Sequence, residues 1–426
     1  MSALAAPALV SSPTLLAETT ISHRRMQLAR LPVPLCVDPA LALVLGDPAI
    51  TGQVVHTATG SLFEARATPT PDGDFLLMFP TNTAAKPTGN CHYAAKTEKA
   101  NDLVVYRSRD RGRTWQGPTV AFDIDYNQHG FIPLTPKSGK RIYAFGTQPV
   151  QGTLSAAHGQ GENSPIGYRF SDDDGKRWSE LRLIRPTNDP GFRGMSVMRM
   201  CETDAGTWLL GSHEADWSFK PLMTRQYVLR STDQGASWTV SPHPRHGGWC
   251  VPQFNRMDEG RPINLGNGEV YLMIRTCEGH LWATRSLDDG VTWAEPAPTP
   301  LVHPDAPPML FHLSDGKTLI AFHHNRHHDL NYVGLGDNPG MQDRSEIWAS
   351  LSSDGGRTWS EPRFVFANAA APDLENGWYN WQCSYLDAFA LDGELHLFLP
   401  HRWQRCLHLR LPESVLTRLP TTDRLA

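Results

Sequence analysis

The sequence predicts an all-β fold, a six-bladed β-propeller, because one short motif recurs along the chain and hairpin signals lie between its copies. The motif Ser-x-Asp-x-Gly-x-x-Trp begins at five serines that are 63, 60, 55 and 66 residues apart: Ser108, Ser171, Ser231, Ser286 and Ser352. Self-similarity at a nearly regular spacing is the signature of a repeat architecture. The five copies therefore predict five similar units within one closed array.

The motif has the composition of a tight turn. Its Asp carboxylate can accept hydrogen bonds from backbone N–H groups, its Gly suits a positive φ, and its Trp can pack back over the turn as an apolar plug. We therefore interpret the motif as structural and not as catalytic.

Strand-like segments surround each motif. In the fourth unit, PINLGNGEVYLMI contains two apolar runs joined by a Gly-Asn-Gly turn, and HLWATRS leads into the motif. Turns of this kind between apolar runs are hairpin signals. A further run follows the Trp, as in SELRLIRP after the second motif. Each unit is therefore predicted to be a four-stranded antiparallel sheet, which is one propeller blade.

The tail of the chain adds a sixth unit that lacks the motif, beginning with SYLDAFALDGELHLFLPHR. We expect a single propeller domain over residues 51–420 and an N-terminal extension over residues 1–50. Residues 21–50 of this extension are expected to close the ring or, in the alternative with seven blades, to contribute most of another blade.

The order of the strands separates the two faces of the propeller. In an antiparallel blade the motif turns and the first hairpin turns share one face, and the loops between second and third strands share the other. The second face receives long, irregular loops, which on a rigid scaffold are where binding and catalysis concentrate. We therefore expect the functional site on the face without motifs.

The net charge and the cysteine content bear on the binding partners and the cellular location of the protein. The net charge of −5 gives no electrostatic case for binding nucleic acid or an anionic membrane surface. Seven scattered cysteines without a CxxC pair are typical of reduced thiols, and the first 20 residues lack the basic start of a signal peptide. We expect a cytoplasmic protein that needs neither a metal nor a cofactor.

Against this acidic background, the predicted rim of the central funnel is rich in arginine and histidine. Arginine binds carboxylates and sulfates through two parallel hydrogen bonds, so such a rim indicates an acidic ligand. The candidate binding residues on the rim are Arg66, His92, Arg193, His213, His246, Arg261, Arg275, His324, Arg326 and Arg344.

The motif in its propeller context resembles the Asp-box, or BNR, repeats of the sialidase (neuraminidase) superfamily over about residues 55–410. The resemblance implies an exo-glycosidase that acts on an acidic oligosaccharide or polysaccharide. In that family three arginines hold the sugar carboxylate, a Tyr activated by a Glu is the nucleophile, and an Asp protonates the leaving group. These roles are expectations for the present chain.

Several residues resemble these family positions. Arg275 at the end of EVYLMIR and Arg344 before EIWASLS resemble two of the arginines, and Glu259 resembles the activating Glu. The family's opening Arg-Ile-Pro pattern appears here only as FEARATP, with Arg66 nearer the hairpin turn, so Arg66 and Arg193 are both candidates for the third arginine. The block NDLVVYRSRDRGRTW resembles the approach to the first family box, which implies that Asp102 or Glu98 is the acid.

The nucleophile position departs from the family order. The family has Tyr followed by Ser, whereas this chain has Ser384 followed by Tyr385. A shift by one residue in a regular strand turns the side chain to the other face. Tyr385 and Tyr379 are both candidates for the nucleophile.

A second set of residues resembles propeller lyases of the ulvan-lyase type, in which an Arg neutralises a uronate and a His or Tyr transfers protons. His92, His129, Tyr168 and His246 supply such groups near the predicted funnel. A His with a pKa near neutrality is suited to proton transfer. The sequence leaves three functions open: a sialidase-like hydrolase, a uronate lyase in which His129 and Tyr168 are catalytic, and a glycan-binding propeller without catalysis.

Overall fold

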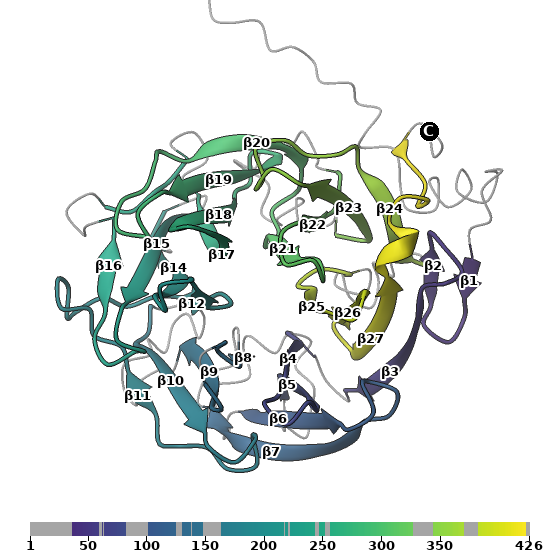
Figure 1. The fold of residues 1–426 in the computed structure, drawn as a ribbon, viewed down its shortest axis with the longest axis horizontal. Coiled ribbons are helices and arrows are strands. Elements are labelled where there is room, and N and C mark those ends of the chain that lie inside the picture. The colour runs from purple at the N-terminus through teal and green to yellow at the C-terminus, as the bar shows by residue number, and fades with distance from the viewer. Residues whose placement is uncertain are drawn as a thin grey trace, which may run out of the picture.

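The computed structural model describes residues 36–422 except for 59–61, 63, 82–100, 125–129, 138, 148–162, 217, 220–221, 243–246, 252–255, 327–343 and 370–381. The described strands form six antiparallel sheets arranged as blades around a central axis (Figure 1). The prediction of an all-β, six-bladed propeller is confirmed.

The first three blades follow one another along the chain, and the first strand of each lies nearest the axis (Figure 1). Blade 1 contains β4 (Arg66–Pro69), β5 (Phe75–Thr81), β6 (Asn101–Ser108) and β7 (Gln116–Ile124). Blade 2 contains β8 (Phe131–Leu134), β9 (Ile142–Thr147), β10 (Ile166–Ser171) and β11 (Arg182–Leu183). Blade 3 contains β12 (Ser196–Val197), β13 (Cys201–Glu202), β14 (Trp208–Asp216), β15 (Met223–Ser231) and β16 (Thr239–Ser241).

The remaining blades repeat this pattern. Blade 4 contains β17 (Asp258–Gly266), β18 (Glu269–Arg275), β19 (His280–Ser286) and β20 (Ala297–Val302). Blade 5 contains β21 (Met309–His312), β22 (Leu319–His323), β23 (Glu346–Ser352) and β24 (Arg363–Asn368). Blade 6 contains β25 (Asp387–Leu391), β26 (Glu394–His401) and β27 (Arg405–Pro412), after which a short 3₁₀ helix spans Glu413–Val415.

The N-terminal part of the described chain completes the ring. β3 (Thr51–Thr57) pairs antiparallel with β27 and is the fourth strand of blade 6, so a segment from the start of the chain joins the end. The preceding hairpin, β1 (Cys36–Asp38) and β2 (Leu43–Leu45), extends the outer edge of blade 5 through pairing of β2 with β24. The ring-closing strand therefore follows residues 21–50, and their described part adds to an existing blade.

The motif turns hold their geometry through side chains, as expected. In the third copy the Gly235 N–H donates to Ser231 Oγ at 2.9 Å, and Ser231 Oγ donates to Asp233 Oδ1 at 2.8 Å. The same carboxylate accepts the Ser237 N–H at 2.8 Å, and the buried Trp238 donates its indole N–H to the Gly235 carbonyl at 3.0 Å. Each turn is thereby closed by its own residues.

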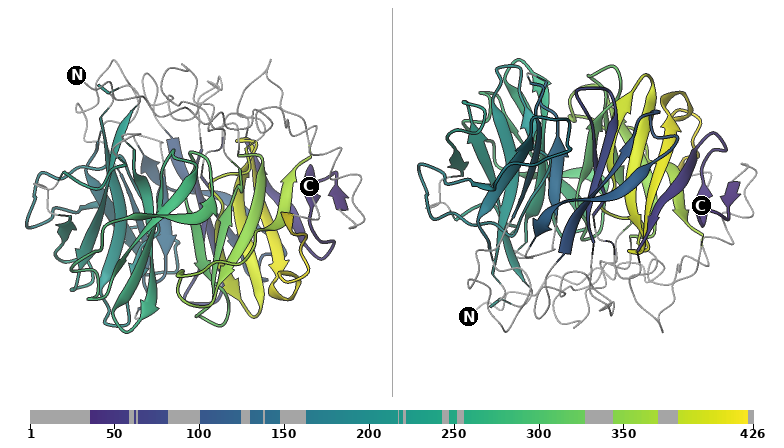
Figure 2. Two further views of the ribbon diagram at one scale, coloured as in Figure 1. Left: turned by 90° about the horizontal axis from the view of Figure 1, so that it is seen from above. Right: turned by 90° about the horizontal axis from the view of Figure 1, so that it is seen from below.

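Hydrophobic clusters pack the blades face to face. Each pair of neighbouring blades shares one cluster, such as that of Phe145, Trp208 and Leu229 between blades 2 and 3. The views from above and below show the blades standing around the axis with their strands running along it (Figure 2). This arrangement brings the first strands of all six blades together at the centre.

A polar network on the axis joins all six blades through Asp387, the first residue of β25. Its carboxylate accepts the Ala67 N–H of blade 1 at 3.0 Å and pairs with Arg199 of blade 3 and Arg261 of blade 4. Arg199 also donates to the Pro133 carbonyl of blade 2, and Arg261 lies 4.0 Å from the ring centroid of Phe311 in blade 5. One buried carboxylate thus fixes the inner ends of the blades.

We predict that Asp387→Asn lowers the free energy of unfolding by about 3–5 kcal/mol, because buried Arg261 and partly buried Arg199 lose their counter-ion. Urea titration followed by Trp fluorescence measures this loss. Asp392→Asn is the matched control, since this exposed carboxylate in the same blade pairs with exposed Arg111 and its loss is expected to cost less than about 1 kcal/mol. Equal losses in both variants would contradict the axial role of Asp387.

Candidate functional site

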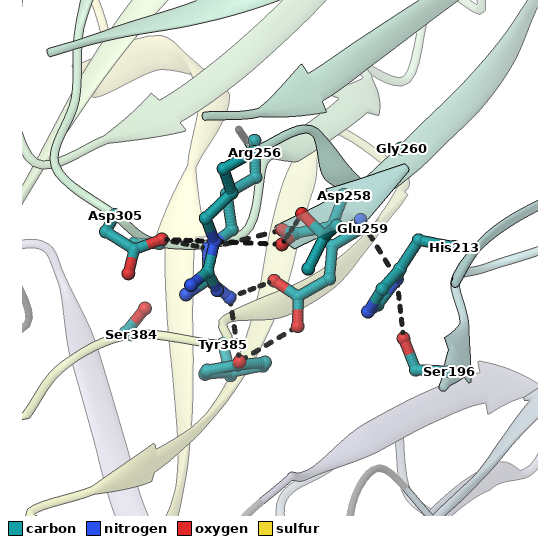
Figure 3. A network of polar contacts seen from close by, with 12 residues as sticks. Ser196, His213, Arg256, Asp258, Glu259, Gly260, Asp305, Ser384 and Tyr385 are labelled. Carbon is teal, nitrogen blue, oxygen red and sulfur yellow. Dashed lines mark hydrogen bonds and ion pairs between the residues drawn. The ribbon is translucent and has the colours of Figure 1, made fainter. Parts of the chain in front are cut away.

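The centre of the candidate site is a hydrogen bond between Tyr385 and Glu259. The Tyr385 hydroxyl donates to Glu259 Oε1 at 2.9 Å, although the residues are 126 positions apart (Figure 3). Tyr385 lies in the link before β25, and Glu259 is the second residue of β17, so both project from innermost strands or their links. Both side chains are buried.

The side-chain directions of Tyr385 and Glu259 depend on an unusual backbone conformation at both residues. Tyr385 has φ 59° and Glu259 has φ 49°, in the left-handed region that non-glycine residues rarely adopt. Because Tyr385 precedes the strand and is left-handed, the alternation of a regular strand does not set its direction. The exchange of Ser384 and Tyr385 relative to the family order therefore does not turn the ring away from Glu259.

Three predicted arginines surround this pair, from blades 1, 4 and 5. Arg275 Nη1 donates to Glu259 Oε2 at 2.6 Å and to the Tyr385 hydroxyl at 3.4 Å. The guanidinium carbons of Arg344 and Arg66 lie 5.7 and 6.0 Å from the centroid of the Tyr385 ring. The structure thus brings together five residues that the sequence analysis singled out from widely separated segments.

Buried carboxylates hold these arginines in place. Asp305, in the link between β20 and β21, accepts from Arg275 Nε at 2.6 Å, and its carbonyl accepts from Arg344 Nε at 3.0 Å. Arg256 Nε lies 3.3 Å from Asp305 and 3.0 Å from Asp258 (Figure 3). Burial opposes the charged form of Asp305, but the guanidiniums of Arg256 and Arg275 outweigh it and lower its pKa.

These supporting acids were not among the residues predicted from the sequence. Glu64 pairs with Arg66 at 2.9 Å, much as Asp305 pairs with Arg275. Asp305 lies in the segment HPDAPP, which carries no motif, while Asp258 and Glu64 lie next to or near predicted site residues. A search for acids beside the candidate arginines would have found Glu64 and Asp258, but the fold alone brings Asp305 to them.

One arginine nitrogen at the centre is left for a ligand. Arg275 Nη2 is buried and has no hydrogen-bond partner among the residues that the structure describes. A buried donor without a partner costs about 1–3 kcal/mol, and an anionic acceptor removes that cost. The site is therefore chemically suited to a carboxylate placed against Arg275.

The electrostatics define the resting state of the Tyr385 hydroxyl. Burial, and next the negative charge of Glu259, raise the pKa of Tyr385 above its ordinary value. The hydroxyl is therefore protonated at neutral pH and donates to Glu259, which is placed to accept the proton.

His213 supports Glu259 from blade 3. Its Nδ1 accepts the Glu259 backbone N–H at 3.4 Å and lies 3.3 Å from Ser196 Oγ (Figure 3). An Nδ1 that accepts a backbone N–H cannot carry the proton of the neutral ring. His213 is therefore held as the tautomer protonated on Nε2, and the contact helps to fix the left-handed backbone at Glu259.

Tyr168, the predicted proton-transfer residue of the lyase alternative, is not part of this cluster. It lies in β10 within the cluster between blades 2 and 3, and its hydroxyl donates to the Gly235 carbonyl in the third motif turn at 3.3 Å. That turn lies on the motif face. The aromatic ring at this strand position is used for blade packing.

His324 and Arg326 contact Glu346 and Ser384, next to the segment that carries Tyr385. His324 is fully buried, donates from Nδ1 to the Glu346 carbonyl at 2.6 Å and lies 3.4 Å from Ser384 Oγ through Nε2. Burial lowers its pKa to about 3, so the ring is neutral at physiological pH. Arg326 Nη1 lies 3.9 Å from a Glu346 oxygen. These residues support the link that carries Tyr385.

The other candidate residues lie away from the Tyr385–Glu259 pair or outside the residues that the structure describes. Arg193 is exposed before β12, and Asp102 lies in β6, the third strand of blade 1, opposite Thr81. Arg261 belongs to the axial network of Asp387. The candidates His92, Glu98, His129, His246 and Tyr379 lie outside the described residues.

In the part of the chain that the structure describes, no helix is long and apolar enough to span a membrane. No group of three or more His, Cys, Asp or Glu side chains there is arranged to hold a metal ion.

The fold and its repeated motif define a class of protein: a six-bladed propeller with BNR repeats. A family model described as "BNR repeat-like domain" matches residues 91–397, and the chain belongs to this family. A comparison with curated protein sequences found no match.

Solved structures similar to this chain share the fold at low sequence identity. A Dyadobacter fermentans protein of unknown function has a TM-score of 0.59 at 15% identity, covering 85% of this chain and 99% of that one. The Streptococcus pneumoniae NanB sialidase has a TM-score of 0.54 at 11% identity, covering 85% and 69%. The Ruminococcus gnavus intramolecular trans-sialidase has a TM-score of 0.55 at 14% identity, covering 88% and 99%. At these identities the likeness concerns the fold alone.

We predict that Asp305→Asn destabilises the protein by about 3–5 kcal/mol at neutral pH, because Arg256 and Arg275 lose a buried counter-ion. The pKa of Asp305 is lower in the folded state than the roughly 3.9 of an unfolded Asp. Its stabilisation is therefore complete above about pH 4 and lost as the pH falls towards the folded pKa. Unfolding free energies measured between pH 7 and pH 2 are expected to fall less steeply in Asp305→Asn, and identical slopes would contradict this assignment.

Proposed function

We propose that the protein is a glycoside hydrolase of sialidase-like type that cleaves the glycosidic bond of a terminal acidic sugar. The observation that carries this proposal is the Tyr385–Glu259 hydrogen bond with three arginines around it. Such a set combines a nucleophile, its base and a cationic clamp within one buried cluster.

The arginines are assigned to substrate binding. Arg66, Arg275 and Arg344 hold the sugar carboxylate, with the unpartnered Arg275 Nη2 as one of the donors. Bonds from guanidinium to carboxylate are charge-assisted and directional, so they also fix the orientation of the sugar ring. The ring is thereby placed over the Tyr385 hydroxyl.

Glu259 then acts as the base and Tyr385 as the nucleophile. Glu259 takes the phenolic proton while the Tyr385 oxygen bonds to the anomeric carbon, and the bond to the leaving oxygen breaks as that oxygen gains a proton. A water molecule later attacks the same carbon, releases Tyr385 and returns a proton to it through Glu259. A neutral Tyr hydroxyl is a suitable nucleophile here because a carboxylate nucleophile would repel the carboxylate of the substrate.

The leaving-group acid comes from the segment that approaches the first motif, with Asp102 and Glu98 as its candidates. This segment leads into β6 of blade 1, the blade that also supplies Arg66. The uronate-lyase alternative loses support because Tyr168 packs between blades 2 and 3. A glycan-binding propeller without catalysis would need no buried nucleophile and base, so we favour the hydrolase.

We predict that Tyr385→Phe lowers kcat by at least about 10³-fold and that Glu259→Gln lowers it by about 10²–10⁴-fold, because one loses the nucleophilic oxygen and the other its base. Release of reducing sugar from sialosides and from uronate-containing glycans measures turnover, and ultraviolet absorbance of unsaturated uronates reports a lyase. Tyr168→Phe is the matched control and is expected to retain activity, since it removes only a contact to Gly235. Unsaturated product, or full activity in Tyr385→Phe, would refute the hydrolase.

We predict that Arg344→Lys lowers kcat/KM by about 10- to 100-fold on a substrate with a free carboxylate, because an ammonium cannot make the paired bonds of a guanidinium. On the methyl ester of the same substrate the wild type and the variant are expected to differ much less. Measuring kcat/KM of the wild type and of Arg344→Lys on the free acid and on its methyl ester gives a thermodynamic cycle that isolates the interaction between Arg344 and the carboxylate. An equal loss on both substrates would show that Arg344 does not bind the carboxylate.

A further inference from the structure

The proposed base Glu259 lies in a β-bulge at the start of β17. The register between β17 and β18 shifts between Asp258 and Arg261. The two residues between them, Glu259 and Gly260, stand opposite the single residue Ile274 of β18. A bulge of this kind redirects a side chain and is frequent next to functional sites. Here it carries the left-handed φ of 49° at Glu259.

Two side chains of blade 3 accept the backbone N–H groups of this bulge. The Glu259 N–H donates to His213 Nδ1 at 3.4 Å (Figure 3), and the Gly260 N–H donates to Gln226 Oε1 at 2.6 Å. Gln226 lies in β15 and is fully buried, and its Nε2 donates to two backbone carbonyls of blade 3 at 2.5 and 2.8 Å. The oxygen and the nitrogen of this amide are therefore both engaged, which holds the side chain in one orientation.

Two glycines allow the bulge to lie this close to blade 3. A Cβ atom on Gly260 would lie 2.6 Å from Cδ of Gln226, and a Cβ atom on Gly211 of β14 would overlap the Gly260 carbonyl oxygen. The backbone of the bulge therefore packs directly against β14 and β15. The position of Glu259 is set from blade 3, whereas its partner Tyr385 is carried by the link into blade 6.

We propose that Gln226 is a positioning residue for Glu259: it locks the bulge against blade 3 and so keeps the Glu259 carboxylate within hydrogen-bond distance of the Tyr385 hydroxyl. The inference rests on the proposed hydrolase function, in which Glu259 is the base. Among the described residues, the Gln226 side chain hydrogen-bonds to backbone groups alone, so its effect passes through the backbone of Gly260. A displacement of about 1 Å in a reacting group lowers the rate by on the order of 10²-fold.

A crystal structure of Gln226→Met tests the geometry without an activity assay. Met has a similar length but is a weak acceptor, so the buried Gly260 N–H loses its partner and the bulge is expected to rearrange. We expect the Glu259 carboxylate to lie more than about 3.5 Å from the Tyr385 hydroxyl. Gly260→Ala is the second variant, because its Cβ would collide with the Gln226 amide, and it is expected to show the same displacement. An unchanged hydrogen bond between Tyr385 and Glu259 in these variants would overturn the proposal.

Kinetics separate positioning from a general loss of structure. Gln226→Met is expected to lower kcat by about 10- to 100-fold and to change KM by less than about 3-fold, because Arg66 and Arg344 are held by other partners. In the Glu259→Gln background the same substitution is expected to have little further effect, because the base through which Gln226 acts is already absent.

Asn188→Leu is the matched control for these kinetics. The Asn188 amide also bridges a backbone N–H and a carbonyl of blade 3, but at Val240 in the outer strand β16, so the variant is expected to retain kcat. A wild-type kcat in Gln226→Met, or equal fold losses in the two backgrounds, would refute the positioning role. Full activity in Glu259→Gln would instead refute the base, and with it the proposed hydrolase, while the crystallographic test of Gln226 would still apply.

Discussion

The rest of the structure depends on the buried carboxylate of Asp387. Among the described residues, the hydrophobic clusters that join blades lie between neighbours, so these clusters leave the inner ends of opposite blades unconnected. Asp387 joins them across the axis by accepting from blade 1 and pairing with arginines of blades 3 and 4. Because Tyr385 lies two residues before it, the same contact fixes the position of the candidate nucleophile relative to blade 4.

The centre of the propeller is a balance of buried charges. An arginine removed from water is tolerated only with a counter-ion, and each arginine around Tyr385 has a carboxylate or a carbonyl as partner: Arg66 with Glu64, Arg275 with Asp305, and Arg344 with the Asp305 carbonyl. The pairing holds the guanidiniums rigidly before any ligand arrives. It also keeps the donor Arg275 Nη2 directed at the site, which is the kind of preorganisation that binding and catalysis require.

The sequence predicted those features that depend on local patterns. The motif copies specified their own turns, because the Ser, Asp and Gly that form each turn lie within five residues of one another. Arg275 and Arg344 could be identified from their places at strand ends, and Glu259 from its place before the same hairpin. The packing position of Tyr168 could not be predicted, because a Tyr that packs between blades and a Tyr that faces the axis have the same appearance in a single strand. Arg199 and Asp387 were missed because neither lies in a motif.

By itself the sequence determined that the chain is a propeller of repeated blades, since this follows from short-range turn and strand chemistry, and it predicted the functional site on the face without motif turns. Only the tertiary structure decided that Tyr385 meets Glu259 over a separation of 126 residues. That contact requires two left-handed backbone positions, which no strand period predicts. They persist because ring closure and the buried ion pairs on the axis hold both segments in place.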